Sequence, residues 1–156
     1  NPDDYFYSSA DSLYVSNTIA AFNNAGIKVN SMRNILDKGV FLTVAVRTQR
    51  TGDTMPAETI KQYSSELQAE IESFPNLKAI LLMGDAAIKA FNLISQRTTG
   101  KRTIPAGSTY KIRKGQFYFK DIRVFPSYLQ TGKNFLIEKA TREMVAEDIK
   151  EAFKLL

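Results

Sequence analysis

The chain lacks two residue types that often supply reactive groups: its 156 residues include no cysteine and no histidine. Without cysteine there is no disulfide, no thiolate nucleophile and no iron–sulfur cluster held by thiolates. Without histidine, imidazole acid–base catalysis and imidazole metal ligation are excluded within this chain. We therefore expect neither a metal site nor a cofactor.

Long apolar runs are absent as well. No stretch approaches the length of a membrane span, and no signal-peptide pattern occurs, so we expect a cytoplasmic monomer that does not contact a membrane. The length and the 44% hydrophobic content suit one packed domain over residues 1–156. The first residue is Asn1 rather than Met, which fits a trimmed N-terminus. The net charge of +5 is a mild bias towards polyanionic partners.

Three short apolar runs dominate the chain and predict strands buried on both faces, as in a parallel sheet. They are Val40–Val46, Ala79–Met83 and Ile122–Phe125. The segments between and around them predict helices, by apolar periodicity and by flanking Ser, Asp, Pro and Gly. These helices are Asp11–Asn24, Ser31–Lys38, Pro56–Ser73, the segment after Gly84-Asp85, and Lys133–Leu156. Such alternation indicates a doubly wound α/β fold, in which ligands bind at the carboxyl ends of the strands.

A basic region separates the second and third predicted strands. Ser95–Ser108 is predicted to be a loop, and Tyr110–Ile112 with Gln116–Phe119 is predicted to form a hairpin around Arg113-Lys114-Gly115. Basic side chains that alternate with aromatic ones are also typical of proteins that bind single-stranded nucleic acid. The residues concerned are Lys101, Arg102, Lys111, Arg113, Lys114, Tyr110, Phe117 and Tyr118. An ordinary hairpin with one buried face is the interpretation that we favour.

The segment Val124-Phe125-Pro126-Ser127-Tyr128-Leu129 resembles the His-Pro-Ser-type motif of the uracil-DNA glycosylase superfamily, with Phe125 in place of the histidine. The order of elements from about Tyr5 onward is similar to the thermostable, iron–sulfur-type branch, without its cysteines. The resemblance implies a three-layer α/β sandwich with a central, mostly parallel sheet. It also implies recognition of a flipped base in DNA and hydrolysis of its N-glycosidic bond, as in DNA repair.

The resemblance assigns roles to particular positions. Phe6, Val44 and Phe125 stand where the family binds the base, and Phe125, Pro126 and Ser127 occupy the position of the catalytic motif. Leu81-Leu82-Met83-Gly84 is similar to the family's apolar strand that ends in glycine. The residues expected to contact DNA are Arg47, Gln49, Arg50, Ser127, Tyr128, Leu129 and Lys133, with Tyr128 and Leu129 as an apolar wedge.

The chain also departs from the family pattern. Val44 replaces an asparagine that reads the base edge, and Phe125 replaces a histidine that stabilises the departing anion. Thr48 and Tyr63 stand where cluster cysteines would be, and the first catalytic loop is absent. We expect DNA, uracil-containing or single-stranded, as the partner. Two alternatives are a non-catalytic nucleic-acid-binding module on the same fold and an enzyme that acts on a free nucleoside or nucleotide.

Overall fold

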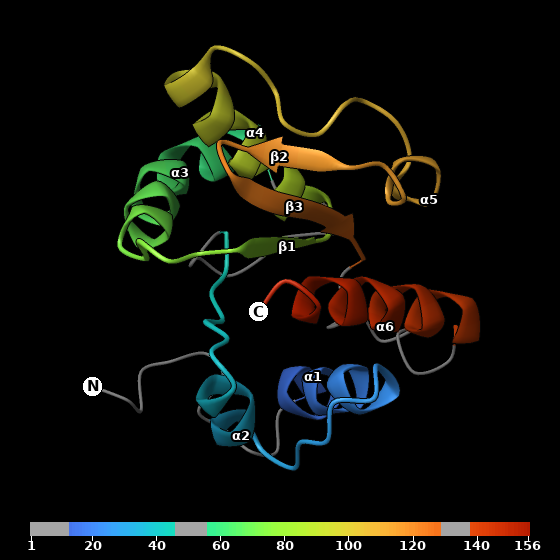
Figure 1. Cartoon of the computed structure of the whole chain (residues 1–156). Coiled ribbons are helices and arrows are strands. Elements are labelled where there is room, and N and C mark those ends of the chain that lie inside the picture. The colour runs from blue at the N-terminus through green and yellow to red at the C-terminus, as the bar shows by residue number, and fades with distance from the viewer. Residues whose placement is uncertain (1–12, 46–55, 129–137) are drawn as a thin grey trace. The chain divides into compact units, whose positions relative to one another are not determined.

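The computed structural model describes residues 13–45, 56–128 and 138–156. The chain divides into two compact units. Unit 1 contains the helices α1, α2 and α6, from both ends of the described chain. Unit 2 contains what the structure describes between Thr43 and Ser127, together with Leu155 and Leu156. Unit 2 holds all three strands of the described residues, and its part from α3 to β3 is drawn from green to orange in Figure 1.

Unit 1 is a helical unit in which α1 (Leu13–Asn24) packs against α6 (Lys139–Phe153). Helix α6 buries Val145, Ile149 and Ala152, which recur at helical spacing and so form one apolar face. At the end of the pair, the rings of Phe22 and Phe153 meet edge to face, with their centroids 5.7 Å apart. The two helices are therefore held together by apolar burial.

Short polar contacts shape the turn between α1 and α2 (Met32–Asp37). The Asn23 side chain accepts a hydrogen bond from the Val29 N–H and donates one to the Val29 carbonyl. The Ser31 hydroxyl accepts a hydrogen bond from the Asn34 N–H and so caps α2, as the sequence predicts. Gly39 follows the helix with φ of 90°, a conformation that favours glycine.

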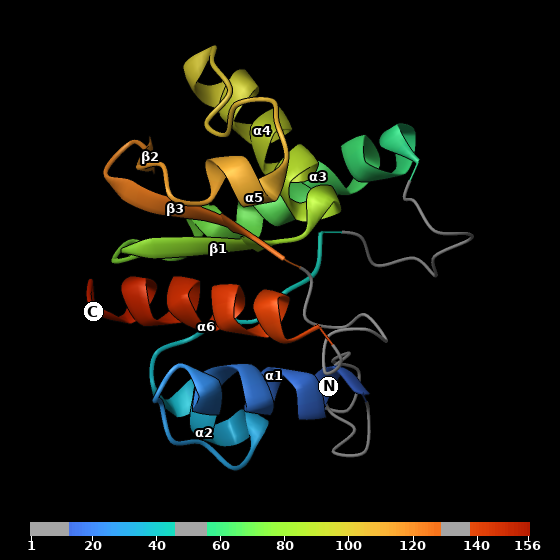
Figure 2. The ribbon, with the colours of Figure 1, turned by 90° about the vertical axis from the view of Figure 1, so that its right-hand side faces the viewer.

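Unit 2 contains a three-stranded mixed sheet in the order β1-β3-β2. Strand β1 (Ala79–Met83) pairs in parallel with β3 (Ile122–Ser127), and the short β2 (Phe117–Phe119) pairs antiparallel with β3. Helices α3 (Ala57–Glu72) and α4 (Asp85–Thr99) lie on one side of this sheet in both views (Figure 1 and Figure 2). The described chain is thus a mixed α/β structure with a small sheet.

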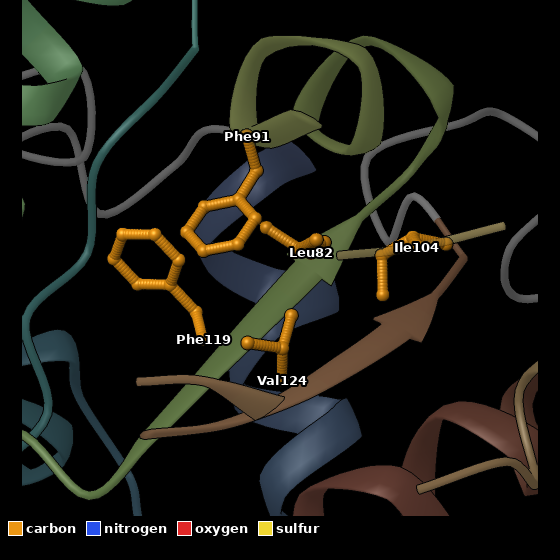
Figure 3. Close-up of a cluster of buried hydrophobic side chains, with 5 residues drawn as sticks. All are labelled: Leu82, Phe91, Ile104, Phe119 and Val124. Carbon is orange, nitrogen blue, oxygen red and sulfur yellow. The ribbon is translucent and has the colours of Figure 1, made fainter. Parts of the chain in front are cut away.

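The sheet and α4 enclose the main core of unit 2, which is formed by Leu82, Phe91, Ile104, Phe119 and Val124 (Figure 3). The rings of Phe91 and Phe119 meet edge to face, with centroids 5.2 Å apart. A second cluster joins α3 to α4 through Ile60, Leu67, Ala90 and Ile94. The burial of these side chains supplies the dominant favourable term in the folding of unit 2.

The prediction of a buried strand at Val40–Val46 is wrong for the residues described, since 40–45 contain no strand. Phe41 is 47% exposed, and the segment lies where unit 1 passes into unit 2. A strand requires a neighbour to pair with its backbone groups, and no described strand pairs here. An apolar run alone does not reveal whether that neighbour exists.

The predicted hairpin is also wrong. Thr109–Ile112 forms a one-turn helix, α5, capped by the Ser108 hydroxyl, and the hairpin joins β2 to β3 instead. Helix α4 continues to Thr99, so the loop predicted from Ser95 starts only after the helix. Gly84 is the N-cap of α4, and Asp85 is its first helical residue.

The other helices agree with the prediction. Pro56 precedes α3 and Ser73 follows it, and α1 ends at Asn24, as expected. Helix α6 starts after Glu138, later than the predicted Lys133, although residues 133–137 lie outside the described ranges. Among the described residues, no helix is both long and apolar enough to cross a membrane.

Candidate nucleic-acid interface

Positive charge is concentrated in one part of unit 2, residues 100–127, which we call the basic segment. It contains seven lysines and arginines and a single acidic residue, Asp121. The rest of the chain contains fourteen basic and fifteen acidic residues, so the excess positive charge of the protein lies within the basic segment. A local excess of one sign creates a potential that attracts polyanions.

Buried polar side chains of α4 fix the start of the basic segment. The Asn92 amide donates a hydrogen bond to the Ile104 carbonyl, and its oxygen accepts from the N–H groups of Thr103 and Ile104, at 2.9–3.1 Å. The Ser95 hydroxyl donates to the Lys101 carbonyl at 2.6 Å and contacts the Thr103 hydroxyl at 2.7 Å. Ile104 itself is fully buried. The loop that presents Lys101 is therefore held by a specific network.

Most cations of the basic segment face solvent, whereas Arg113 is buried and Arg123 is half-buried. Lys101, Arg102, Lys111 and Lys114 are exposed, and none forms an ion pair with another residue in the part of the chain that the structure describes. Elsewhere, Lys139 and Lys154 pair with neighbouring glutamates on α6. Exposed cations that no described carboxylate pairs with are available to phosphate oxygens.

Two exposed tyrosines accompany these cations. Tyr110 on α5 is 71% exposed and Tyr118 on β2 is 57% exposed, although aromatic side chains are usually buried. Tyr118 lies opposite Arg123 in the β2–β3 pairing. The Arg123 guanidinium lies over the Tyr118 ring at 5.8 Å and over the Phe125 ring at 4.5 Å. The three side chains form an aromatic–cation–aromatic row across the hairpin, which we call the Tyr118 row.

The carboxyl ends of β1 and β3 meet as predicted. Met83 pairs with Ser127, and the Gly84 N–H donates a hydrogen bond to the Ser127 carbonyl at 3.1 Å. Gly84 has φ of 105° and ψ of 170°, a backbone conformation almost confined to glycine. Because its N–H is engaged in this bond, Gly84 does not offer that group to an anion. The junction is a structural joint between two strands.

The residues predicted to bind the base and the DNA are mostly not available at a surface. Phe125 is 3% exposed and Ser127 is fully buried, so neither side chain can reach a base or a phosphate in this conformation. Val44 is not on a strand and Tyr128 is half-buried. The remaining predicted residues lie outside the described ranges: Phe6, Arg47, Gln49, Arg50, Leu129 and Lys133. Of a cleft lined by Phe6, Arg47, Gly84 and Phe125–Tyr128, as the convergence of strand ends predicts, the structure describes only Gly84 and Phe125–Tyr128.

A small cavity lies beside the basic segment. This cavity of about 140 Å³ between α4 and the loop is lined by Lys89, Arg102, Pro105 and Thr109, among others. Ligand pockets usually measure about 300–1,000 Å³. Within the described residues, no group of acidic side chains could hold a metal ion. The arrangement therefore suits an extended ligand on an open surface.

Comparison of the sequence with protein-family models finds no match, and none of the curated proteins matches it either. The functional assignment accordingly depends on the chemistry of the surface. The sequence contained the signals for that surface, a one-sided charge distribution and interleaved aromatics. Only the structure shows that Tyr110 and Tyr118 are exposed.

Proposed function

We propose that this protein binds nucleic acid through the exposed side of the basic segment. The observation on which the proposal depends is the charge segregation, seven basic residues against one acidic residue within 100–127. Lysine and arginine pair with phosphates and release condensed counterions, which gives affinity without sequence preference. The exposed Tyr118 supports a nucleic acid over other polyanions, because bases stack on aromatic side chains.

The fold that we propose for the whole chain is a three-layer α/β sandwich of the uracil-DNA glycosylase type, with a mostly parallel sheet. The parallel pairing of β1 with β3 supports it, as does the contact between Gly84 and Ser127. Both join segments that resemble motifs of that superfamily. We further propose that DNA is the nucleic acid that the protein encounters.

Base excision is the second candidate, because the segments Leu81–Gly84 and Val124–Leu129 resemble motifs of the glycosylase superfamily. We expect binding without efficient excision. Val44 and Phe125 cannot supply the hydrogen bonds that the family uses, and the loss of one preorganised donor typically costs about a hundred- to a thousand-fold in rate. Incubation with uracil-containing single- and double-stranded DNA, followed by cleavage of abasic sites, measures any product. Robust turnover that Phe6→Ala abolishes would contradict this expectation.

Binding is tested by titrating a fluorescently labelled oligonucleotide and following its anisotropy over a series of salt concentrations. The site variant reverses four exposed cations of the basic segment: Lys101→Glu, Arg102→Glu, Lys111→Glu and Lys114→Glu. The control variant makes the same change of net charge at exposed positions elsewhere: Lys28→Glu, Lys38→Glu, Lys61→Glu and Lys78→Glu. Both variants must show the far-UV circular dichroism of the parent.

For a single strand, each phosphate contact contributes about 0.7 to the slope of log affinity against log salt concentration. The site variant should therefore lower that slope by about 3, and the control variant should leave it unchanged. Equal losses in the two variants would show that binding depends on net charge and not on the basic segment. Absence of binding by the parent protein at low salt would refute the proposed function.

A further inference from the structure

We propose that Tyr118 is a stacking platform for an unpaired base of single-stranded DNA, an inference that rests on the proposed nucleic-acid function. Tyr118 lies on β2, which pairs only with β3 among the described strands and so forms an edge of the sheet. More than half of the residue is open to solvent, with an exposed fraction of 57%. An exposed aromatic ring at a sheet edge is accessible to a flat ligand without any opening of the fold.

The Tyr118 row fixes the ring in place before any ligand arrives. Arg123 lies opposite Tyr118 across the hairpin, and its guanidinium lies over the Tyr118 ring at 5.8 Å and over the buried Phe125 ring at 4.5 Å. The Arg123 Nε atom is buried and has no hydrogen-bond partner among the described residues. The two ring faces are therefore the main partners described for this guanidinium. An aromatic side chain ordered in this way loses little conformational entropy when a base stacks on it.

The surroundings of Tyr118 favour a base within a nucleic-acid strand over an apolar ligand. Two cations belong to this hairpin: Arg123 lies over the Tyr118 ring, and Lys120 follows β2 in the turn, with its ammonium over the neighbouring Phe119 ring at 5.4 Å. Asp121 is the single acidic residue of the segment. In a nucleic-acid strand, the base can stack on the ring while the phosphates pair with the cations. The bases of a duplex are stacked on each other and cannot present a face to a ring on the protein surface. The chemistry at Tyr118 therefore distinguishes single-stranded from double-stranded DNA.

Tyr110 is the matched control for this assignment. It is exposed to a similar degree and lies in the same basic segment, yet no cation is stacked on its ring in the described structure. Replacement of either tyrosine by leucine keeps an apolar side chain and the net charge while removing the aromatic ring. Tyr118→Phe retains the ring and serves as the conservative variant.

Removal of one stacked base typically weakens binding about five-fold or more. We expect that loss for Tyr118→Leu with an oligothymidylate strand, and no loss for Tyr118→Phe or Tyr110→Leu. Binding of a duplex of the same length should be the same in all four proteins. Equal losses in Tyr118→Leu and Tyr110→Leu, or an equal loss on the duplex, would overturn the assignment.

The chain contains no tryptophan, so Tyr118→Trp introduces a single indole as a direct reporter. Oligothymidylate should quench its fluorescence, whereas inorganic polyphosphate, which has the charge but no bases, should not. Binding of oligothymidylate without quenching would overturn the stacking role and leave the proposed function intact. Failure of the parent protein to bind either polymer at low salt would instead remove the proposed function itself.

Discussion

The buried Asn92 amide makes a specific prediction about what holds the basic segment in place. In Asn92→Ala, the amide that bonds to the carbonyl of Ile104 and to the N–H groups of Thr103 and Ile104 is lost. Both bonds to Ile104 are buried, and the bond to Thr103 is partly buried. The variant therefore leaves polar backbone groups without partners inside the protein.

The magnitude follows from these bonds. A buried donor or acceptor that loses its partner costs about 1–3 kcal/mol. Two such groups on Ile104 give a range of about 2–6 kcal/mol, and the entry of water at the half-open Thr103 end favours the lower part of it. We expect Asn92→Ala to lower the free energy of unfolding of unit 2 by about 3 kcal/mol.

Urea denaturation followed by far-UV circular dichroism measures this loss, and hydrogen exchange resolves the Ile104 amide directly. The control is Gln96→Ala, which removes a similar amide from an exposed position of the same helix and should change stability by less than about 0.5 kcal/mol. If Asn92→Ala is no more destabilising than Gln96→Ala, the network does not hold the loop. Retained protection of the Ile104 amide in the variant would lead to the same conclusion.

Three further predictions concern the core and the backbone of unit 2. Phe91→Ala should lower the free energy of unfolding by about 3–5 kcal/mol, because it removes a fully buried ring beside Phe119. If urea titration shows a smaller loss for Phe91→Ala than for Ile94→Val, the described core is contradicted. Gly84→Ala should lower the free energy of unfolding by about 1–3 kcal/mol, since a residue with a side chain is strained at φ of 105° and ψ of 170°. A melting temperature unchanged from the parent would contradict this backbone conformation of Gly84. Gly100→Ala should lower the free energy of unfolding by about 1–2 kcal/mol, because φ of 77° strains the backbone while open space surrounds the position. A larger loss of stability than in Gly84→Ala, measured by the same thermal melt, would contradict the open space at this position.

The helices could be predicted from the sequence because their signals are local. Ser31 caps α2 through its own hydroxyl, and Pro56 precedes α3 at the position where a missing N–H does not matter. Gly39 and Gly100 end helices with positive φ. Each of these signals acts within a few residues of the boundary that it sets, so no knowledge of distant contacts is needed.

The strands could be predicted only where the chain provides a partner. Ala79–Met83 and Ile122–Phe125 pair with each other, whereas 40–45 has the same apolar composition and pairs with no described strand. Pairing is a long-range property that composition does not encode. The one-turn helix at Thr109–Ile112 has the same origin, since four residues are too few for a periodic pattern to separate helix from strand.

The candidate site could be predicted in part. The charge and the interleaved aromatics of the basic segment are visible in the sequence, but a buried hairpin and an exposed binding face share that pattern. Tyr118 and Phe119 are adjacent in the chain, yet one is 57% exposed and the other 5%. That alternation depends on which face of β2 meets α4, and the resemblance to a family drew attention instead to Phe125 and Ser127, which are buried.

The division of the chain has a consequence for the order in which it can fold during synthesis. Helix α1 is made before unit 2, but its partner α6 is made only after that unit. The apolar side of α1, including Phe22, must therefore wait for Phe153 while the whole of the intervening unit is translated. Unit 2 draws its strands and its main core from one continuous stretch and can form first. The apolar side of α1 that faces α6 is thus uncovered while unit 2 is made, which is the interval in which a chaperone that binds apolar helices would act.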